Sequence, residues 1–345
     1  MTLVRERILA VAVAVLALAG CASFDQADDL AFVRRPGNRM YDAPERTSIS
    51  AKDLWEYAVL SENTYIARAQ GGTIENGADA SAYVRACVPE PRIRLPLAGW
   101  KAWENFPPDE GPGTKDVRTK DLRTKAKERG LHFEVWETTT RPTVIAVAFR
   151  GTEAGDKEDW KANFRWFLRF VPFYTDEYVE VSQDVGRALV DRLKTRLADG
   201  TLDRNVRLVA TGHSLGGGLA QHLAYSLPAD GSGDTALPRI TKVYAFDPSP
   251  VTGWSTVPNN PRDRNVQGLE TTRAFEHGEI LAYVRLILSY VNPPSKTNPA
   301  ITEIRYNFIK LNPLSSHSMR MMACALINAS GTARIPDIAE RFKQN

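Results

Sequence analysis

Hydrophobic residues recur along the chain in two patterns, one typical of strands and one typical of helices. Residues 131–138 (LHFEVWET) alternate apolar and polar positions, as a strand covered on one side does. Residues 143–149 (TVIAVAF) are almost continuously apolar and rich in β-branched side chains, as expected of a central strand buried on both faces. The same criteria predict further strands at 206–210, 240–246, 271–275 and 301–308.

Apolar residues spaced three and four apart predict helices at 53–65, 176–197, 215–227 and 318–327. Pro228 ends the third of these, because proline lacks the backbone N–H that a continuing helix needs. Strands that alternate with helices favour parallel pairing, since parallel neighbours need a crossover segment between them. We therefore expect an α/β protein with a mostly parallel central sheet and helices on both faces.

The N-terminal residues have the pattern of an export signal. Arg5 and Arg7 precede an apolar run at 8–19, which is shorter than the ~20 residues that a helix needs to cross a bilayer. The run leads into 18–21 (LAGC), which resembles the lipobox of bacterial lipoproteins. The resemblance implies that Cys21 carries acyl chains such as palmitate and anchors the protein to the cell envelope, with Ala22 favouring the outer membrane. An ordinary cleaved signal is the alternative.

Composition narrows the class of protein. The chain has 345 residues, of which 43% are hydrophobic and 25% charged, and these values exclude collagen-like, wholly disordered and polytopic membrane proteins. A net charge of +3 and the lack of a basic stripe argue against a nucleic-acid partner. We expect a signal peptide at 1–20, a polar tether at 21–50 and one domain at 51–345, with an excursion at 107–130 that is rich in Pro, Gly and charge.

The cysteines and histidines indicate whether a disulfide and a metal site are expected. Once Cys21 is set aside, Cys87 and Cys324 remain, and in an oxidising compartment they permit one disulfide. Two buried thiols are an equal alternative. No paired-cysteine or HExxH spacing occurs and the histidines are scattered, so we expect neither a metal site nor a cofactor.

The segment 206–218 (VRLVATGHSLGGG) runs from an apolar strand through a glycine-rich turn into a helix. Gly212, Ser214 and Gly216 form the G-x-S-x-G pattern of a nucleophile elbow, in the strand–turn–helix context that this motif requires. The serine must occupy a strained turn to project its hydroxyl, and the flanking backbone then comes so close that only glycine fits. We expect Ser214 to be a catalytic nucleophile, the alternative being a tight glycine turn with an idle serine.

A serine hydroxyl is a weak nucleophile without a neighbouring base, and histidine is the usual one. In enzymes with this elbow the chain order is serine, acid, histidine, which excludes His132 and His213. His222 lies two turns along the elbow helix and points toward core or solvent. His277 and His317 remain, and we favour His317 because it lies in a loop between the last strand and the last helix.

The acid of such a triad follows a late strand. Glu279, in the loop after the strand at 271–275, is the favoured residue. Asp247, at the end of the strand at 240–246, is the main alternative and Glu276 a lesser one. Each of the three is also compatible with an ordinary surface carboxylate, the more common fate of an acidic residue.

The oxyanion of an acyl-transfer reaction needs two donors. The N–H of Leu215, directly after the nucleophile, is one, and an earlier strand-end loop supplies the other. The segments 148–152 (AFRGT), 159–163 (DWKAN) and 212–217 (GHSLGG) resemble the class 3, fungal-type lipase family of α/β-hydrolases. The resemblance implies an α/β-hydrolase fold in which Thr152 completes the oxyanion hole. The chain departs from that family in having Glu279 where an aspartate is usual.

These observations predict a serine ester hydrolase of lipids, of lipase or phospholipase type, tethered to the cell envelope. A general carboxylesterase or thioesterase is the alternative within enzymes, and a catalytically inactive hydrolase-fold scaffold is the alternative from another class. Residues 164–174 (FRWFLRFVPFY) are dense in aromatic side chains, which favours a lid or acyl-chain wall over the active site. An ordinary buried helix and turn is the alternative. The expected partners are a lipid or acyl-ester substrate and, through Cys21, the membrane.

Overall fold

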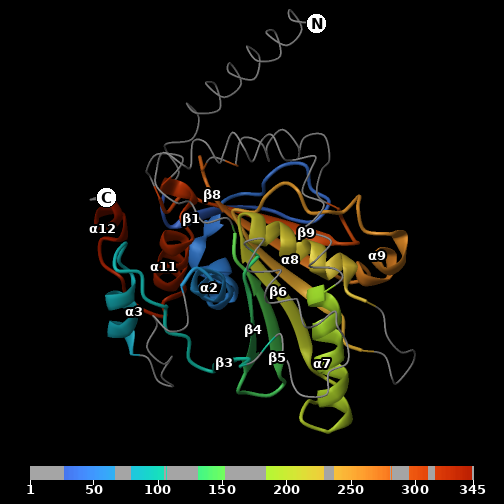
Figure 1. Ribbon diagram of the computed structural model, residues 1–345. Coiled ribbons are helices and arrows are strands. Elements are labelled where there is room, and N and C mark those ends of the chain that lie inside the picture. Colours follow the sequence, from blue (N-terminus) through green and yellow to red (C-terminus); the bar gives the residue numbers. More distant parts are fainter. Residues whose placement is uncertain are drawn as a thin grey trace, which may run out of the picture.

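The computed structural model describes residues 27–66, 79–104, 106, 131–151, 184–228, 237–279, 281, 295–309 and 315–343 (Figure 1). Several expectations fall outside these residues: the signal peptide at 1–20, Cys21, the excursion at 107–130, the motif at 159–163, Thr152 and the aromatic segment at 164–174.

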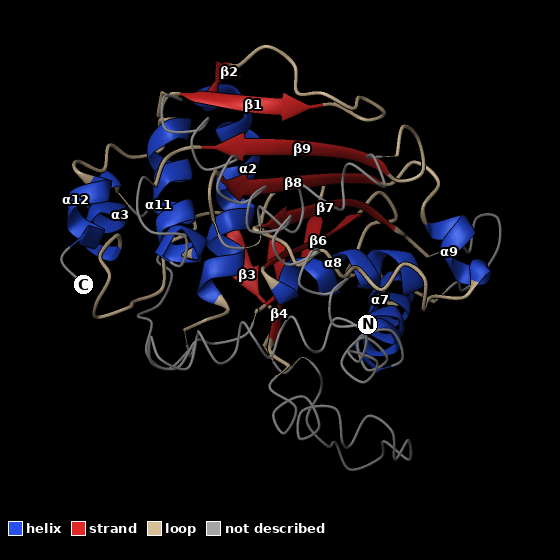
Figure 2. Ribbon diagram, turned by 90° about the horizontal axis from the view of Figure 1, so that it is seen from above, coloured by secondary structure: helices blue, strands red, loops and turns tan. Residues whose placement is uncertain are grey.

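One sheet of nine strands forms the centre of the molecule (Figure 2). In order across the sheet the strands are β2 (Glu45–Arg46), β1 (Leu30–Arg34), β9 (Ala300–Tyr306), β8 (Glu270–Glu276), β7 (Ile240–Phe246), β6 (Arg207–His213), β5 (Val144–Phe149), β4 (Phe133–Thr138) and β3 (Trp100–Ala102). The six strands predicted from hydrophobic pattern correspond to β4 through β9, and β1, β2 and β3 were not predicted.

The expectation of a mostly parallel sheet was wrong, because the sheet is mixed. The strands from β5 to β9 pair in parallel, whereas β1 with β9, β1 with β2, β4 with β5 and β3 with β4 pair antiparallel. The cause is clearest between β4 and β5, where residues 139–143 form a connection too short for the crossover that a parallel pair needs. The parallel arrangement is confined to the centre of the sheet, where it brings the ends of five strands to one edge.

Helices cover both faces of the sheet, as predicted (Figure 1). The described helices are α2 (Thr47–Asn63), α3 (Ala80–Ala86), α7 (Gly186–Ala198), α8 (Leu215–Ser226), α9 (Asn259–Asn265), α11 (Met319–Ser330) and α12 (Ile338–Lys343). Strand β5 shows how the two layers are built. Its alternate residues Ile145, Val147 and Phe149 pack with α7 and α8, while Val144, Ala146 and Ala148 pack with α2 and α11. The continuous apolar pattern of β5 therefore reflects burial on both faces.

The N-terminal part of the described chain belongs to the sheet rather than to a tether. Residues 30–34 form β1, which pairs with β9, and Ala31 and Val33 are buried. The expected tether at 21–50 therefore enters the fold from Leu30 onward. The strand itself is apolar, but it has only five residues within a polar stretch and depends on pairing with β2 and β9.

A disulfide joins Cys87, at the end of α3, to Cys324 on α11. The two cysteines are 237 residues apart in sequence, so the bond links the early and late parts of the fold. Of the two arrangements that the sequence left open, the structure has the disulfide.

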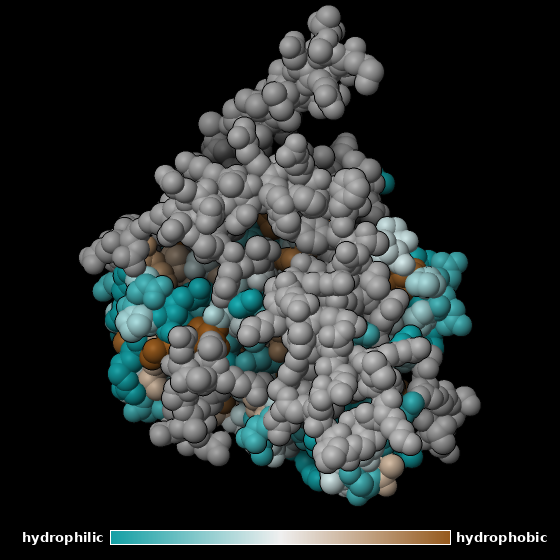
Figure 3. Space-filling model, viewed as in Figure 1, coloured by the Kyte–Doolittle hydropathy of each residue, from teal (hydrophilic) through white to brown (hydrophobic). Residues whose placement is uncertain are grey.

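The described surface mixes polar residues with small, separate apolar areas on the face shown in Figure 3. Over the whole described surface, the exposed large apolar side chains include Met40, Ile49, Ile93 and Trp254. Within the described part of the chain, every helix is too short or too polar to cross a bilayer.

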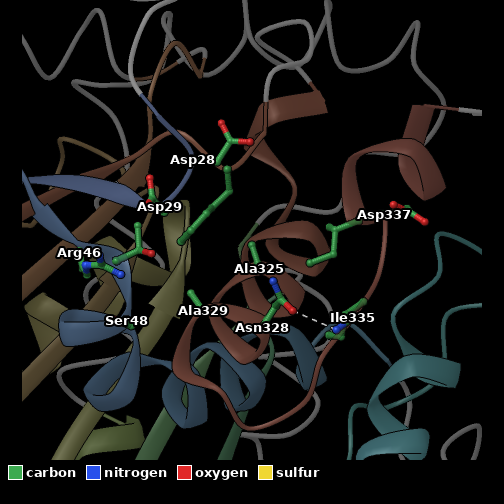
Figure 4. Close-up of a pocket in the computed structure, with 12 residues that line it drawn as sticks. Asp28, Asp29, Arg46, Ser48, Ala325, Asn328, Ala329, Ile335 and Asp337 are labelled. Atoms are coloured by element: carbon green, nitrogen blue, oxygen red, sulfur yellow. Dashed lines mark hydrogen bonds between the residues drawn. The ribbon is translucent and has the colours of Figure 1, made fainter.

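A pocket of about 560 Å³ lies where the start of α2 meets α11 and α12 (Figure 4). Ala325, Ala329 and Ile335 supply apolar lining, and Asp29 and Asp337 are among the carboxylates around it. None of the residues that line this pocket belongs to the predicted triad.

Candidate active site

Ser214 occupies the sharp turn between β6 and α8. Its backbone angles are φ 56° and ψ −123°, a conformation that residues with a Cβ rarely adopt. Hydrogen bonds fix this turn on both sides: the Ser214 N–H donates to the Phe246 carbonyl at 2.9 Å, and the Ser249 N–H donates to the Ser214 carbonyl at 2.9 Å. Ser214 is only partly buried, whereas the residues on either side of it are buried. The strained turn therefore leaves Ser214 partly exposed, although its neighbours are buried.

The glycines of the motif are required by close backbone contacts. A Cβ on Gly212 would lie 2.3 Å from the Gly216 carbonyl oxygen, and a Cβ on Gly216 would lie 2.3 Å from the Phe149 carbonyl oxygen. Real Cβ atoms do not approach backbone oxygens so closely, so any side chain would force the turn apart. The second contact also shows that the elbow lies directly against the end of β5.

His317 and Glu279 are hydrogen-bonded to each other. His317 ends the 3-10 turn at Ser315–His317, just before α11, and Glu279 follows β8. The His317 Nδ1 atom lies 2.9 Å from Oε2 of Glu279, and the Leu281 N–H donates to the same carboxylate oxygen at 2.8 Å. Glu279 is fully buried and His317 is 5% exposed. The carboxylate thus holds one side of the imidazole ring, so the other ring nitrogen, Nε2, faces away from it.

The imidazole of His317 lies beside the elbow. Its ring centroid is 4.7 Å from that of His213, the residue directly before Ser214. The late loop that carries His317 and the early turn that carries Ser214 therefore meet at the edge where the parallel strands end. Such an edge is where open α/β sheets usually place their ligands.

Asp247 contacts a different imidazole. Its Oδ1 atom accepts a hydrogen bond from the Glu276 N–H at 2.9 Å, and its Oδ2 atom lies 3.9 Å from Nε2 of His213. Asp247 is fully buried and has a φ of 39°, so it too sits in an unusual backbone conformation. Of the candidate acids, Glu279 is therefore the one hydrogen-bonded to His317. Glu276 is also buried, and burial raises the pKa of its carboxyl well above the ordinary value.

Leu215 and the loop after β5 lie on the two sides of Ser214. Leu215 is the first residue of α8, and the N–H groups of a helix's first turn have no partner within the helix. On the other side, a Cβ on Gly151 would lie 3.0 Å from the Ser214 Cβ, so the loop is in contact with the serine. Thr152 is the next residue and lies outside the described part of the chain.

Tyr65 and His213 complete the site, and neither was predicted from the sequence to have a role there. The Tyr65 hydroxyl accepts a hydrogen bond from the Gly151 N–H at 3.0 Å and lies 2.8 Å from Nδ1 of His213. Burial raises the pKa of the Tyr65 hydroxyl, which keeps it protonated. No sequence signal pairs two residues 148 positions apart, although a tyrosine at the end of the first predicted helix was visible. We call Tyr65, His213, Ser214, Asp247, Glu279 and His317 the elbow cluster.

The remaining histidines have other surroundings. His277 is half-buried in the turn after β8, and burial together with the Arg305 guanidinium lowers the pKa of its imidazole to about 4. His222 is buried on α8. The structure therefore gives a hydrogen-bonded carboxylate to His317, and a nearby positive charge to His277.

Comparison with known proteins is consistent with this geometry. The model of one protein family, described as the Tle-like phospholipase domain, matches residues 56–232, which is just over half of the chain. The matched region contains Tyr65, the loop after β5 and the whole elbow, and ends before Glu279 and His317. No curated protein matches the sequence. The chain belongs to the family of Tle-like phospholipase domains.

Proposed function

We propose that this protein is a serine ester hydrolase that cleaves acyl esters of phospholipids through a triad of Ser214, His317 and Glu279. The observation that carries the proposal is the buried hydrogen bond between Glu279 and His317, formed beside a strained serine turn. Membership of the phospholipase family supports the substrate class independently of this geometry.

The chemistry follows the roles that each group can play. The Ser214 Oγ atom attacks the ester carbonyl while Nε2 of His317 accepts its proton, and the carbonyl oxygen becomes an oxyanion. The imidazolium then gives the proton to the leaving alcohol as the acyl–oxygen bond breaks, which leaves an acyl group on Ser214. A water molecule then gives a proton to Nε2 of His317 and attacks the acyl carbon, and the bond to Ser214 Oγ breaks as the imidazolium returns the proton to the serine, which releases the fatty acid. Glu279 orients the imidazole and stabilises its charged form.

The oxyanion in this proposal is stabilised by the N–H of Leu215 at the start of α8 and by a donor from Thr152. The start of α8 supports the first role, because helix N-termini favour negative charge. The contact between Gly151 and Ser214 supports the second, since the next residue along the chain is Thr152.

The fold and location belong to the same proposal. The strand–elbow–helix order, the parallel centre of the sheet and the late histidine support an α/β-hydrolase fold related to class 3 lipases. The sequence at 18–21 supports a lipid anchor on Cys21 that holds the enzyme at the cell envelope, next to its substrate. In this arrangement the aromatic segment at 164–174 contacts acyl chains.

A carboxylesterase or thioesterase would use the same triad on soluble esters, and a scaffold would not use it at all. An inactive scaffold has no need for a backbone conformation as unfavourable as that of Ser214. The family match favours a phospholipid over a soluble ester.

Labelling with a fluorophosphonate probe tests the proposal directly. We expect covalent labelling of the purified chain at Ser214, no labelling of Ser214→Ala, and full labelling of a control, Ser226→Ala, at the other end of α8. Release of fatty acid from phospholipid vesicles should exceed hydrolysis of short p-nitrophenyl esters. Folded protein that resists the probe would favour the scaffold, and activity confined to short esters would favour the esterase.

A further inference from the structure

Three side chains of the elbow cluster bring metal-binding atoms together. His213, Asp247 and His317 each offer one ligand atom, and these atoms lie within 4.8 Å of one another. In a tetrahedral zinc site with bonds of about 2.0–2.1 Å, ligand atoms are roughly 3.4 Å apart. One pair, Nε2 of His213 and Oδ2 of Asp247, is at 3.9 Å. Side-chain rotations that shift the ligand atoms by about 1 Å would bring all three within bonding distance of one ion.

Each of the three side chains is also held at its opposite polar atom. Glu279 binds Nδ1 of His317 at 2.9 Å, the Tyr65 hydroxyl lies 2.8 Å from Nδ1 of His213, and the Glu276 N–H donates to Oδ1 of Asp247 at 2.9 Å. Metal-binding histidines and carboxylates usually have such outer partners, which orient the ligand atom and raise the affinity for the ion. The arrangement therefore has the two layers of a metal site.

All three side chains are at most 5% exposed. Burial of this kind distinguishes them from the acidic groups that cluster by chance on a protein surface. Two imidazoles and one carboxylate suit Zn²⁺ and similar transition metals, whereas Ca²⁺ and Mg²⁺ prefer a shell of oxygen atoms.

We propose that His213, Asp247 and His317 form a binding site for Zn²⁺ that inhibits the enzyme. The inhibition, though not the binding, rests on the proposed role of His317 as the catalytic base. A Zn²⁺ ion bonded to Nε2 of His317 occupies the lone pair that would accept the Ser214 proton. Metal binding and proton transfer therefore exclude each other, and hydrolysis stops until the ion leaves.

The binding is tested first in a protein that cannot hydrolyse esters. Ser214→Ala, produced without a histidine tag, is titrated with Zn²⁺ by calorimetry and in thermal melts. We expect one ion per chain and a melting temperature that rises with Zn²⁺ concentration. The affinity should fall as pH decreases from 7.5 to 5.5, because protons compete for the imidazoles. Absence of binding at one ion per chain would overturn the site.

Ligand variants in the same background locate the ion. His213→Asn and Asp247→Asn should each weaken Zn²⁺ binding by about 100-fold or more, since even outer partners of metal ligands contribute tenfold or more. The matched control is His277→Asn, a histidine of the same end of the sheet that lies outside the set, and its affinity should be unchanged. Each melting shift is measured against the variant's own metal-free value, so a change in stability does not mimic lost binding. Equal affinity in all three variants would place the ion elsewhere.

The wild-type chain tests the inhibition. Zn²⁺ should suppress both fluorophosphonate labelling and ester hydrolysis with a midpoint that matches its affinity for Ser214→Ala, and a chelator should restore both. Calcium should not reproduce this effect. If Zn²⁺ binds with the expected ligands but leaves labelling unchanged, the inhibition alone is overturned. If the chain is never labelled even without Zn²⁺, the proposed function is refuted, and the metal site is still tested by the calorimetry.

Discussion

Two groups of buried carboxylates in the described part of the fold differ in their partners. On the α2 side, Glu62 accepts a hydrogen bond from Arg92 at 2.8 Å and lies 2.8 Å from Nε of Arg320. Glu134 accepts two hydrogen bonds from Arg94, at 2.5 and 3.0 Å. We call these the arginine-paired carboxylates. In the elbow cluster, the described partners of the carboxylates are imidazoles and backbone N–H groups.

The difference separates a fixed charge from a movable proton. Arginine stays protonated at any ordinary pH, so a carboxylate paired with it forms a permanent ion pair that can only hold structure together. An imidazole changes its charge near neutral pH, and a carboxylate beside it stabilises the charged form when it appears. The arginine-paired carboxylates should therefore govern folding, and the elbow cluster should govern reaction.

The two acids of the elbow cluster can be distinguished by neutralising each in turn. Glu279→Gln should lower kcat by about 10³–10⁴-fold, as loss of the orienting acid does in other serine hydrolases. Asp247→Asn keeps the Oδ1 acceptor for the Glu276 N–H, and the carboxylate oxygen that it changes lies 3.9 Å from Nε2 of His213, so kcat should fall by about tenfold or less. Steady-state hydrolysis of a phospholipid and a soluble ester measures both.

Denaturant titrations should show that Glu279→Gln stays folded, with a stability close to that of the wild type. A larger loss of activity in Asp247→Asn than in Glu279→Gln would reverse the assignment of the acid. A loss of activity in Glu279→Gln that tracks unfolding would make Glu279 a structural residue like the arginine-paired ones.

At an arginine-paired carboxylate we expect the opposite result, which is a loss of stability without a loss of activity. Glu62→Gln should lower the free energy of unfolding by about 3–5 kcal/mol, because Arg320 is 2% exposed and would be left as a buried charge. The folded fraction should keep its activity. The matched control is Asp42→Asn, which breaks an ion pair with the exposed Arg35 and should change stability by about 0.5 kcal/mol or less. Urea titrations followed by circular dichroism would contradict this account if both variants lost the same stability.

The sequence predicted the elements whose signal is local. Strand β5 is apolar at every position because both its faces are buried, and the glycines around Ser214 are dictated by contacts within one turn. Strands β1, β2 and β3 escaped prediction because they have five, two and three residues and depend on a neighbour for pairing. The mixed character of the sheet comes from the antiparallel pairs that these strands make and from the antiparallel pair of β4 with β5.

The residues of the site also differ in how local their sequence signal is. Chain order excluded two histidines, and the place of His317 in a loop before the last helix favoured it over His277. The choice between Glu279 and Asp247 needed the distance to the imidazole, which no spacing encodes. Tyr65, His213 and the convergence of His213 with Asp247 were missed because their partners come from separate strands and helices. Long-range contacts of this kind are fixed by the register of the sheet, which a single sequence does not reveal.

A third test concerns the cost in stability of the elbow itself. Ser214→Gly should raise the free energy of unfolding by about 1 kcal/mol, because glycine adopts a φ of 56° without the penalty that a Cβ incurs. Ser214→Ala keeps the Cβ and should leave stability nearly unchanged, while both variants lose activity. The difference between their urea midpoints reports the backbone strain less the ~0.4–1 kcal/mol by which the greater conformational freedom of glycine stabilises the unfolded chain. A Ser214→Gly protein less stable than Ser214→Ala by about that amount would mean that the elbow stores no strain.

The smallest effect comes from His277, whose neighbour is the Arg305 guanidinium rather than a carboxylate. The pKa of His277 is lowered to about 4 in the folded chain, against an ordinary value of 6.5, so the unfolded chain binds more protons between these two values. The contribution of His277 to stability is therefore complete above pH 6.5 and is lost as the pH falls toward 4. Because the side chain is only half-buried, solvent screening should limit the effect to about 1 kcal/mol or less. His277→Asn should lose less stability than the wild type between pH 7 and pH 4.5 in urea titrations, with activity retained, since the residue lies outside the elbow cluster. Parallel stability curves for the two proteins would show that neither burial nor the nearby guanidinium lowers the pKa of this imidazole in the folded chain, and the contrast between His277 and His317 would then not arise from their surroundings.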